Sequence, residues 1–147
     1  MDDLINLMVE KKTFLSATLA VYEFQDQQAD SVKFKGFKKM MEFIGKASEA
    51  GVNVVVGSHS VVPYAESGWA YHREMELLAA SGMTNKEVIM AATLENARFF
   101  KVDDRLGSIT TGKQADLILL AGNPLDDIKN MRNVKKVMLN GSWVNKN

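Results

Sequence analysis

The stretch that most constrains the fold is "VNVVVG" at residues 52–57. Its valines show no clear alternation with polar residues, so a strand formed here would be apolar on both faces. Strands of this kind belong to parallel sheets that are covered on both sides. The stretch therefore predicts an α/β fold. The residues around its end, Gly57-Ser58-His59-Ser60, would lie at the carboxyl end of a buried strand.

The neighbouring segments supply the alternation of helices and strands that such a sheet needs. Apolar residues at helical spacing behind two aspartates predict a helix over residues 2–11. The apolar run at 13–21 predicts a strand, and the polar stretch at 23–31 predicts a loop. Further helices are expected at 32–50, near 67–81 and near 85–98.

Short capping and turn signals mark the ends of several elements. Gly51 suits a helix C-terminal cap, and Thr84 with Glu87 forms a T-x-x-E capping box. After residue 100, glycine turns separate short apolar runs, and Asn140-Gly141 is a two-residue hairpin signal. We therefore expect residues 101–147 to form a small antiparallel β unit attached to an α/β unit at 1–100.

Composition excludes several classes of function. Lysine and arginine total 18, as do aspartate and glutamate, so the formal net charge is zero. Because nucleic-acid-binding proteins normally carry a basic excess, we expect no nucleic-acid partner. The absence of cysteine excludes disulfides and thiolate nucleophiles. No stretch approaches the ~20 apolar residues of a membrane helix, and the N-terminus lacks a signal-peptide pattern. We expect a cytoplasmic protein without a membrane partner.

The two histidines are the main candidates for chemistry. His59 follows the buried strand, where α/β sheets and barrels place active sites, although it could equally hydrogen-bond within a loop. His72 and Glu76 lie on one helical face, and with His59 they could supply three ligands to a zinc ion. The alternative is a surface i,i+4 pair beside the apolar stripe of this helix. That stripe consists of Tyr71, Met75 and Leu78.

Three segments resemble a known family. The most specific is "GSITTGKQADLILL" at 107–120, which is similar to G-x-I-x-x-G-K-x-A-D-L-[VI]. "AATLENAR" at 91–98 and "YHREMELLAASGMT" at 71–84 resemble two further motifs of the same enzymes. On these residues the chain resembles the C-terminal part of a metal-dependent amidohydrolase, in the branch of imidazolonepropionase-like and Xaa-Pro dipeptidase-like enzymes.

The resemblance implies a fold and a reaction class. Members of this superfamily have a (β/α)₈ barrel and a β-sandwich, and they use zinc or a similar metal to hydrolyse C–N bonds. It places barrel strand seven at about 14–20, strand eight at about 53–57 and the sandwich strands within 107–145. The chain is therefore expected to be a partial TIM-type barrel, holding the last two β/α units, followed by a small antiparallel β unit.

Two departures from the family bear on activity. A (β/α)₈ barrel typically needs about 250 residues, and the family's other metal ligands would all lie upstream of this chain. The strand-eight motif of the family is G-T-D-[AS], so His59 stands where its metal-binding aspartate would be. Imidazole lacks the negative charge of a carboxylate. We therefore interpret His59 as the vacated place of a metal ligand and expect no cofactor for this chain alone. The resemblance makes His72 a substrate-side residue.

Three functions compete on these grounds. The first is a catalytically incomplete amidohydrolase fragment or split subunit, which would need an N-terminal partner chain. The second is a non-catalytic domain that associates with itself into a homo-oligomer, because a partial barrel leaves sheet edges uncovered. The third is a reduced single-metal hydrolase that uses His59, His72 and Glu76.

Overall fold

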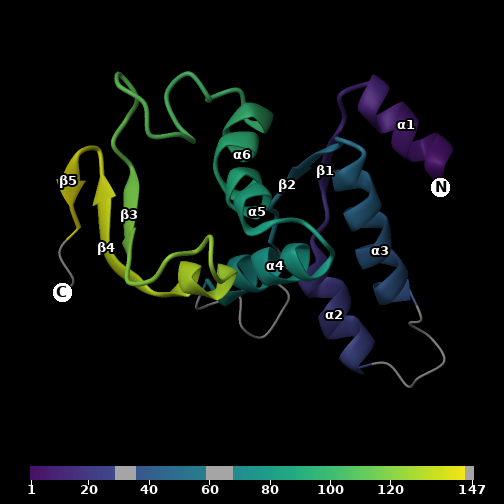
Figure 1. Cartoon of the computed structure of the whole chain (residues 1–147). Helices are drawn as coiled ribbons and strands as arrows, with labels where there is room; N and C mark the ends of the chain where they lie inside the picture. Colours follow the sequence, from purple (N-terminus) through teal and green to yellow (C-terminus); the bar gives the residue numbers. More distant parts are fainter. Residues whose placement is uncertain (29–35, 59–67, 145–147) are drawn as a thin grey trace.

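The computed structural model describes residues 1–28, 36–58 and 68–144, and Figure 1 shows their arrangement. The helices are α1 (Asp2–Glu10), α2 (Leu19–Gln28), α3 (Gly36–Glu49), α4 (Trp69–Ala80), α5 (Asn85–Ala92), α6 (Leu94–Phe99) and the short 3₁₀ helix η2 (Ile128–Arg132). The strands are β1 (Phe14–Ser16), β2 (Asn53–Val55), β3 (Leu117–Leu120), β4 (Val134–Leu139) and β5 (Ser142–Trp143). None of the described helices combines the length and apolar character needed to cross a membrane.

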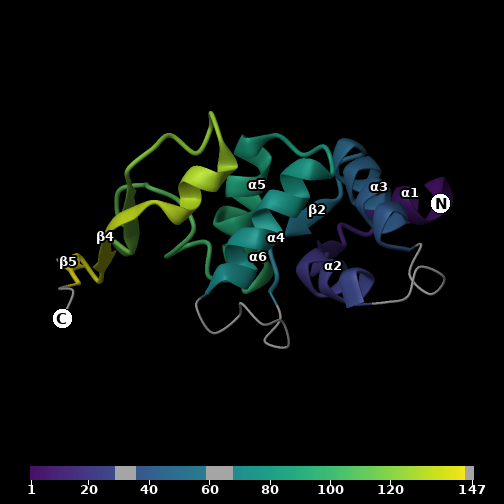
Figure 2. The ribbon, with the colours of Figure 1, turned by 90° about the horizontal axis from the view of Figure 1, so that it is seen from below.

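The predicted parallel pairing is confirmed. β1 and β2 pair in parallel, with Leu15 opposite Val54, and both α2 and α3 lie between them in the chain. Val54 and Val55 point to opposite faces and are both buried, which is what the unalternated valines predict. The main core lies between these strands and the helices α3, α4 and α5 (Figure 2).

Both strands are shorter than predicted. Strand seven was expected at about 14–20, but β1 ends at Ser16 because Thr18 takes up a left-handed conformation with φ of +49°. Strand eight was expected at about 53–57, but β2 ends at Val55. The Val56 N–H then donates to the carbonyl of Ala91 in α5.

The expected loop at 23–31 is wrong over its first part, because residues up to Gln28 belong to α2. This helix is stabilised mainly at its start, where Leu19, Ala20 and Val21 are all buried. Its first two backbone N–H groups donate to the carboxylate of Glu74, which lies far away in sequence. A tertiary cap of this kind leaves no signal in the local sequence, since the polar stretch itself shows no helical pattern.

The expected single helix near 85–98 is two helices. Its capping box is confirmed, because the Thr84 side chain accepts from the Glu87 N–H and the Glu87 carboxylate accepts from the Thr84 N–H. At Thr93, however, φ of −126° and ψ of −83° interrupt the helix. The Thr93 hydroxyl donates to the Ile89 carbonyl at 2.7 Å, a local bond that competes with the helical ladder.

The predicted antiparallel β unit is confirmed in β3, β4 and β5, which lie at the end of the molecule opposite α1 (Figure 1). Asn140 and Gly141 form the hairpin turn with φ of +48° and +76°. Positive φ at both positions is the requirement of a type I′ turn. The predicted division at residue 100 stays a prediction.

Candidate functional site

The candidate site lies at the carboxyl ends of β1 and β2, the end where barrel enzymes carry their active sites. Here the chain after β1 contacts the chain after β2: a Cβ added to Gly57 would lie 2.3 Å from Ser16 Oγ and 3.2 Å from Thr18 Cγ2. A side chain at 57 would therefore have to displace the Ser16 hydroxyl, and it would press against the Thr18 methyl group. His59 lies outside the described residues, and its role stays a prediction.

A buried carboxylate supports this end of the molecule from α4. The Glu74 side chain has no exposed surface. Its Oε1 accepts from the Leu19 N–H and its Oε2 from the Ala20 N–H, both at 2.8 Å. Burial raises the pKa of Glu74 to about 7, although the two backbone hydrogen bonds act in the opposite direction. Glu74 thus satisfies the start of α2, immediately after β1.

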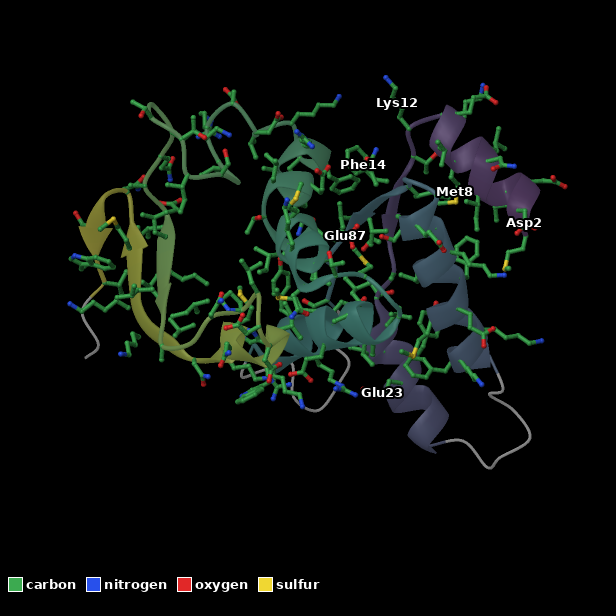
Figure 3. The ribbon with its side chains drawn as sticks, viewed as in Figure 1. Asp2, Met8, Lys12, Phe14, Glu23 and Glu87 are labelled. Carbon is green, nitrogen blue, oxygen red and sulfur yellow. The ribbon has the colours of Figure 1, made fainter. Side chains whose placement is uncertain are left out.

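A charged network links α2, α4 and η2 beside Glu74. Arg73 donates to Glu23 of α2 through both Nε and Nη2, in a bidentate arrangement, and Nη1 donates to Glu76 Oε2 at 2.8 Å. Glu76 Oε1 lies 2.5 Å from Arg132 Nη2 of η2. Figure 3 labels Glu23, which lies where α2 faces α4. The network joins the segment before β4 to the helices at the strand ends.

His72 is placed against this network but not paired within it. Its ring lies 6.3 Å from the ring of Trp69, measured between centroids, and Arg132 stacks over the same Trp69 ring at 4.3 Å. Partial burial, together with the positive charge of Arg132, lowers the pKa of His72, while Glu76 opposes this shift. The imidazole is therefore mainly neutral at pH 7. Its Nδ1 is buried and, among the described residues, has no hydrogen-bond partner.

Glu76 differs from both sequence predictions made for it. It is 9% exposed rather than a surface residue, and it forms ion pairs with Arg73 and Arg132, although its Oε1 makes no hydrogen bond among the described residues. The apolar stripe predicted beside it is confirmed, since Met75 and Leu78 are buried. Among the side chains that the structure describes, no group of three or more His, Asp or Glu residues could hold a metal ion. The described residues therefore do not fit the metal that the family uses.

A network of uncharged hydrogen-bonding groups connects the end of β2 to α4, α5 and α6. Tyr71 donates its hydroxyl to the Ala92 carbonyl at 2.9 Å, and Asn96 donates to the Val56 carbonyl at 3.0 Å and to the Tyr71 oxygen at 3.2 Å. Burial raises the pKa of Tyr71. These bonds fix the end of β2 against α5 and α6.

The motif that most specifically resembles the family is structural in this chain. Lys113 donates to the carbonyls of Asp103 and Leu106, which holds the loop after α6. Asp116 accepts from the Asn140 N–H at 2.8 Å and so supports the hairpin between β4 and β5. Gly107 has φ of +87°, and a Cβ there would lie 2.6 Å from the Cβ of Ala97. These residues build the scaffold and do not line the strand ends.

Three charged residues of the candidate site, Arg73, Glu74 and Arg132, were not predicted from the sequence. Glu74 did carry a signal: it lies four residues after Ala70 and four before Leu78, on an otherwise apolar helical face. A charge in such a position indicates a buried partner. Arg132 carried no comparable signal, because its partner is set by the fold.

The chain matches the sequence profile of the amidohydrolase family over residues 1–144. Among proteins of curated function, none matches it. A crystal structure of a Xaa-Pro dipeptidase with methionine bound in its active site superposes with a TM-score of 0.86 at 28% identity, over 98% of this chain and 37% of that one. A putative prolidase from Bifidobacterium longum gives 0.75 at 31% identity, over 90% and 35%. Ochratoxinase from A. niger gives 0.79 at 27% identity, over 97% and 34%.

The chain thus spans little more than a third of the length of these structures. The predicted fold is confirmed: β1 and β2, with their helices, correspond to part of an amidohydrolase barrel, and β3 to β5 form a small antiparallel unit beside it. Because the profile matches nearly the whole chain, this protein belongs to the amidohydrolase family.

Proposed function

We propose that this chain is the C-terminal part of a hydrolase of C–N bonds, in non-peptide amides or in dipeptides, and that it is catalytically incomplete alone. The observation that carries the proposal is the parallel pair β1–β2. Within the described residues, each strand has one edge with no strand beside it. A barrel must close on itself to remove such edges. An N-terminal chain or segment with the remaining strands would pair with both edges and bring the other metal ligands.

The candidate site supports this reading in two ways. Glu74 and the arginine network hold the strand ends, α2 and α4 together, so a scaffold for a site is present. The described residues contain no three-donor group for a metal, so the ligands would come mainly from the complementing strands. We propose His72 as a substrate-side residue, because a neutral imidazole can both donate and accept a hydrogen bond.

A chimera tests the proposal. Residues 1–144 would replace the matching C-terminal part of the Xaa-Pro dipeptidase, and proline release from an Xaa-Pro dipeptide would be measured after loading with zinc. We expect the isolated chain to be inactive and the chimera to be weakly active. The His59→Asp chimera should gain roughly 10²-fold in rate, because a positioned acid–base group typically contributes 10²–10⁴-fold.

The matched control is Ser60→Asp, which adds the same charge one residue further along. It should give no gain. A His59→Asp chimera that folds but hydrolyses neither Xaa-Pro dipeptides nor N-acyl amides would contradict the proposal. Zinc-dependent hydrolysis by the isolated chain, abolished in His72→Ala, would instead establish the reduced single-metal hydrolase.

A second candidate, a non-catalytic self-associating domain, is favoured by one observation. Ile118, Val137 and Leu139 lie on one face of the β3–β4 sheet and are 47%, 40% and 54% exposed. Apolar residues gathered on one sheet face are typical of an interface. Self-association alone does not separate this candidate from the first, because an incomplete fragment can also associate with itself before it meets an N-terminal partner. Activity of the chimera separates the two candidates.

A further inference from the structure

Glu74 combines two features that rarely occur together. It is a carboxylate without exposed surface, and no lysine or arginine forms a salt bridge with it among the described residues. Its neighbour Arg73 is engaged by Glu23 and Glu76 instead. A buried carboxylate without a cation is unfavourable unless hydrogen bonds replace its water. Among the described residues, its hydrogen-bond donors are the N–H groups of Leu19 and Ala20.

The turn that receives these hydrogen bonds is strained. Thr18 is β-branched and has φ of +49°, a left-handed conformation that such residues rarely adopt. Its hydroxyl donates to the Ala17 carbonyl at 2.8 Å, and its carbonyl accepts from the Val21 N–H. Strain of this kind persists only where the surroundings over-determine the backbone. The two hydrogen bonds from Glu74 directly follow Thr18 and provide that constraint.

The same turn contacts the end of the neighbouring strand. Gly57 has no room for a Cβ because Ser16 Oγ and Thr18 Cγ2 occupy that space. The hydrogen bonds of Glu74 hold the turn after β1 in place. This turn limits where Gly57 and Ser58, which follow β2, can lie. Glu74 itself belongs to α4, which follows both strands in the sequence.

From this geometry we propose that Glu74 is a positioning residue, which holds the strained Thr18 turn against Gly57 so that the carboxyl ends of β1 and β2 keep one relative placement. The inference rests on the proposed function only in assigning these ends to an active site. The placement itself is a property of the isolated chain and can be measured there without activity.

The decisive experiment records amide spectra and hydrogen exchange of the isolated chain, for the wild type, Glu74→Gln and the control Glu87→Gln. Glu87 also accepts from the backbone at a helix start, but it is exposed and it caps α5 rather than the turn after β1. In Glu74→Gln we expect the Leu19 and Ala20 amides to exchange at least about tenfold faster than in the wild type. The amide resonances of Gly57 and Ser58 should shift as well. Glu87→Gln should change neither pair.

The response of Gly57 and Ser58 separates positioning from simple helix capping. Faster exchange at Leu19 and Ala20 with unshifted Gly57 and Ser58 resonances would reduce Glu74 to a cap and overturn the proposal. Unchanged exchange at Leu19 and Ala20 would overturn it too.

A double-mutant cycle keeps the proposal testable if Glu74→Gln folds poorly. Thr18→Gly removes the strain that Glu74 is proposed to hold, and Glu74→Gln should already release part of that strain. Thr18→Gly should therefore raise the denaturation midpoint less in the Glu74→Gln background than in the wild type. Equal effects of Thr18→Gly in the two backgrounds would contradict the proposed coupling between these residues.

Discussion

The buried site of Glu74 favours the protonated carboxyl over the carboxylate. Burial raises its pKa from 4.5 to about 7 in the folded chain. Between these two pH values the folded state keeps a proton that the unfolded state has lost, so stability falls as pH rises through this window. At 1.36 kcal/mol per pKa unit, the contribution amounts to about 3 kcal/mol, fully present below pH 4.5 and lost at pH 7.

Unfolding by denaturant between pH 4 and pH 8 measures this contribution. The free energy of unfolding of the wild type, minus that of Glu74→Gln, should decrease with rising pH and level off above pH 7. Taking the difference removes the opposite contribution of His72, whose lowered pKa makes its stabilising effect disappear as pH falls. A pH-independent difference would show that Glu74 has an ordinary pKa.

Arg132 links two elements of the structure. It lies in η2 and forms an ion pair with Glu76 of α4. Removing it leaves the buried Glu76 with Arg73 alone and uncovers the Trp69 ring. We expect Arg132→Ala to lower the free energy of unfolding by about 1–3 kcal/mol, the range for a buried polar group deprived of a partner. The control is Arg98→Ala, which breaks an i,i+3 pair with Glu95 and should cost under about 1 kcal/mol. Chemical denaturation compares the two, and equal losses would contradict the proposed role of burial.

Gly107 joins α6 to the β unit at a crowded position. Gly107 and Gly112 have similar left-handed backbones, with φ of +87° and +92°, but only Gly107 has atoms within 4 Å of an added Cβ. Gly112→Ala should cost about 1 kcal/mol, from backbone strain alone. Gly107→Ala adds the clash with Ala97 and should cost about 1–3 kcal/mol more. Thermal unfolding of both variants checks the difference, and equal costs would show that the Gly107 loop relaxes freely.

Elements with local signals were predicted from the sequence, and those set by distant contacts were not. Three predicted features are determined by residues that are close in the sequence. They are the capping box at Thr84, the turn at Asn140-Gly141 and the buried valines of β2. The start of α2 depends on Glu74, and the end of β2 on the Ala91 carbonyl, both of which only the fold brings near. The roles predicted for His59 and His72 stay predictions, and the charged surroundings of His72 were not predicted. Trp69 lies three residues before His72 on the same helix, but Arg132 comes from η2, which only the fold brings near.

At the scale of the whole molecule, the described residues leave apolar side chains and strand edges uncovered. The face of β3 and β4 formed by Ile118, Val137 and Leu139 carries such side chains, and the strand pair β1–β2 has uncovered edges within the described residues. Burying apolar surface is favourable by roughly 25 cal/mol per Å². We therefore expect the isolated chain to self-associate through this sheet face.

A charge at the centre of the face tests this prediction. Val137→Lys places an ammonium group between Ile118 and Leu139, and desolvating it in an interface would be costly. The control Leu125→Lys adds the same charge at an apolar residue that is 56% exposed but lies outside the sheet. In sedimentation velocity, Val137→Lys should shift the chain toward the monomer while Leu125→Lys stays associated. If both variants sediment like the wild type, the association uses another surface, such as the open edges of β1 and β2, and the sheet face is left for an N-terminal partner.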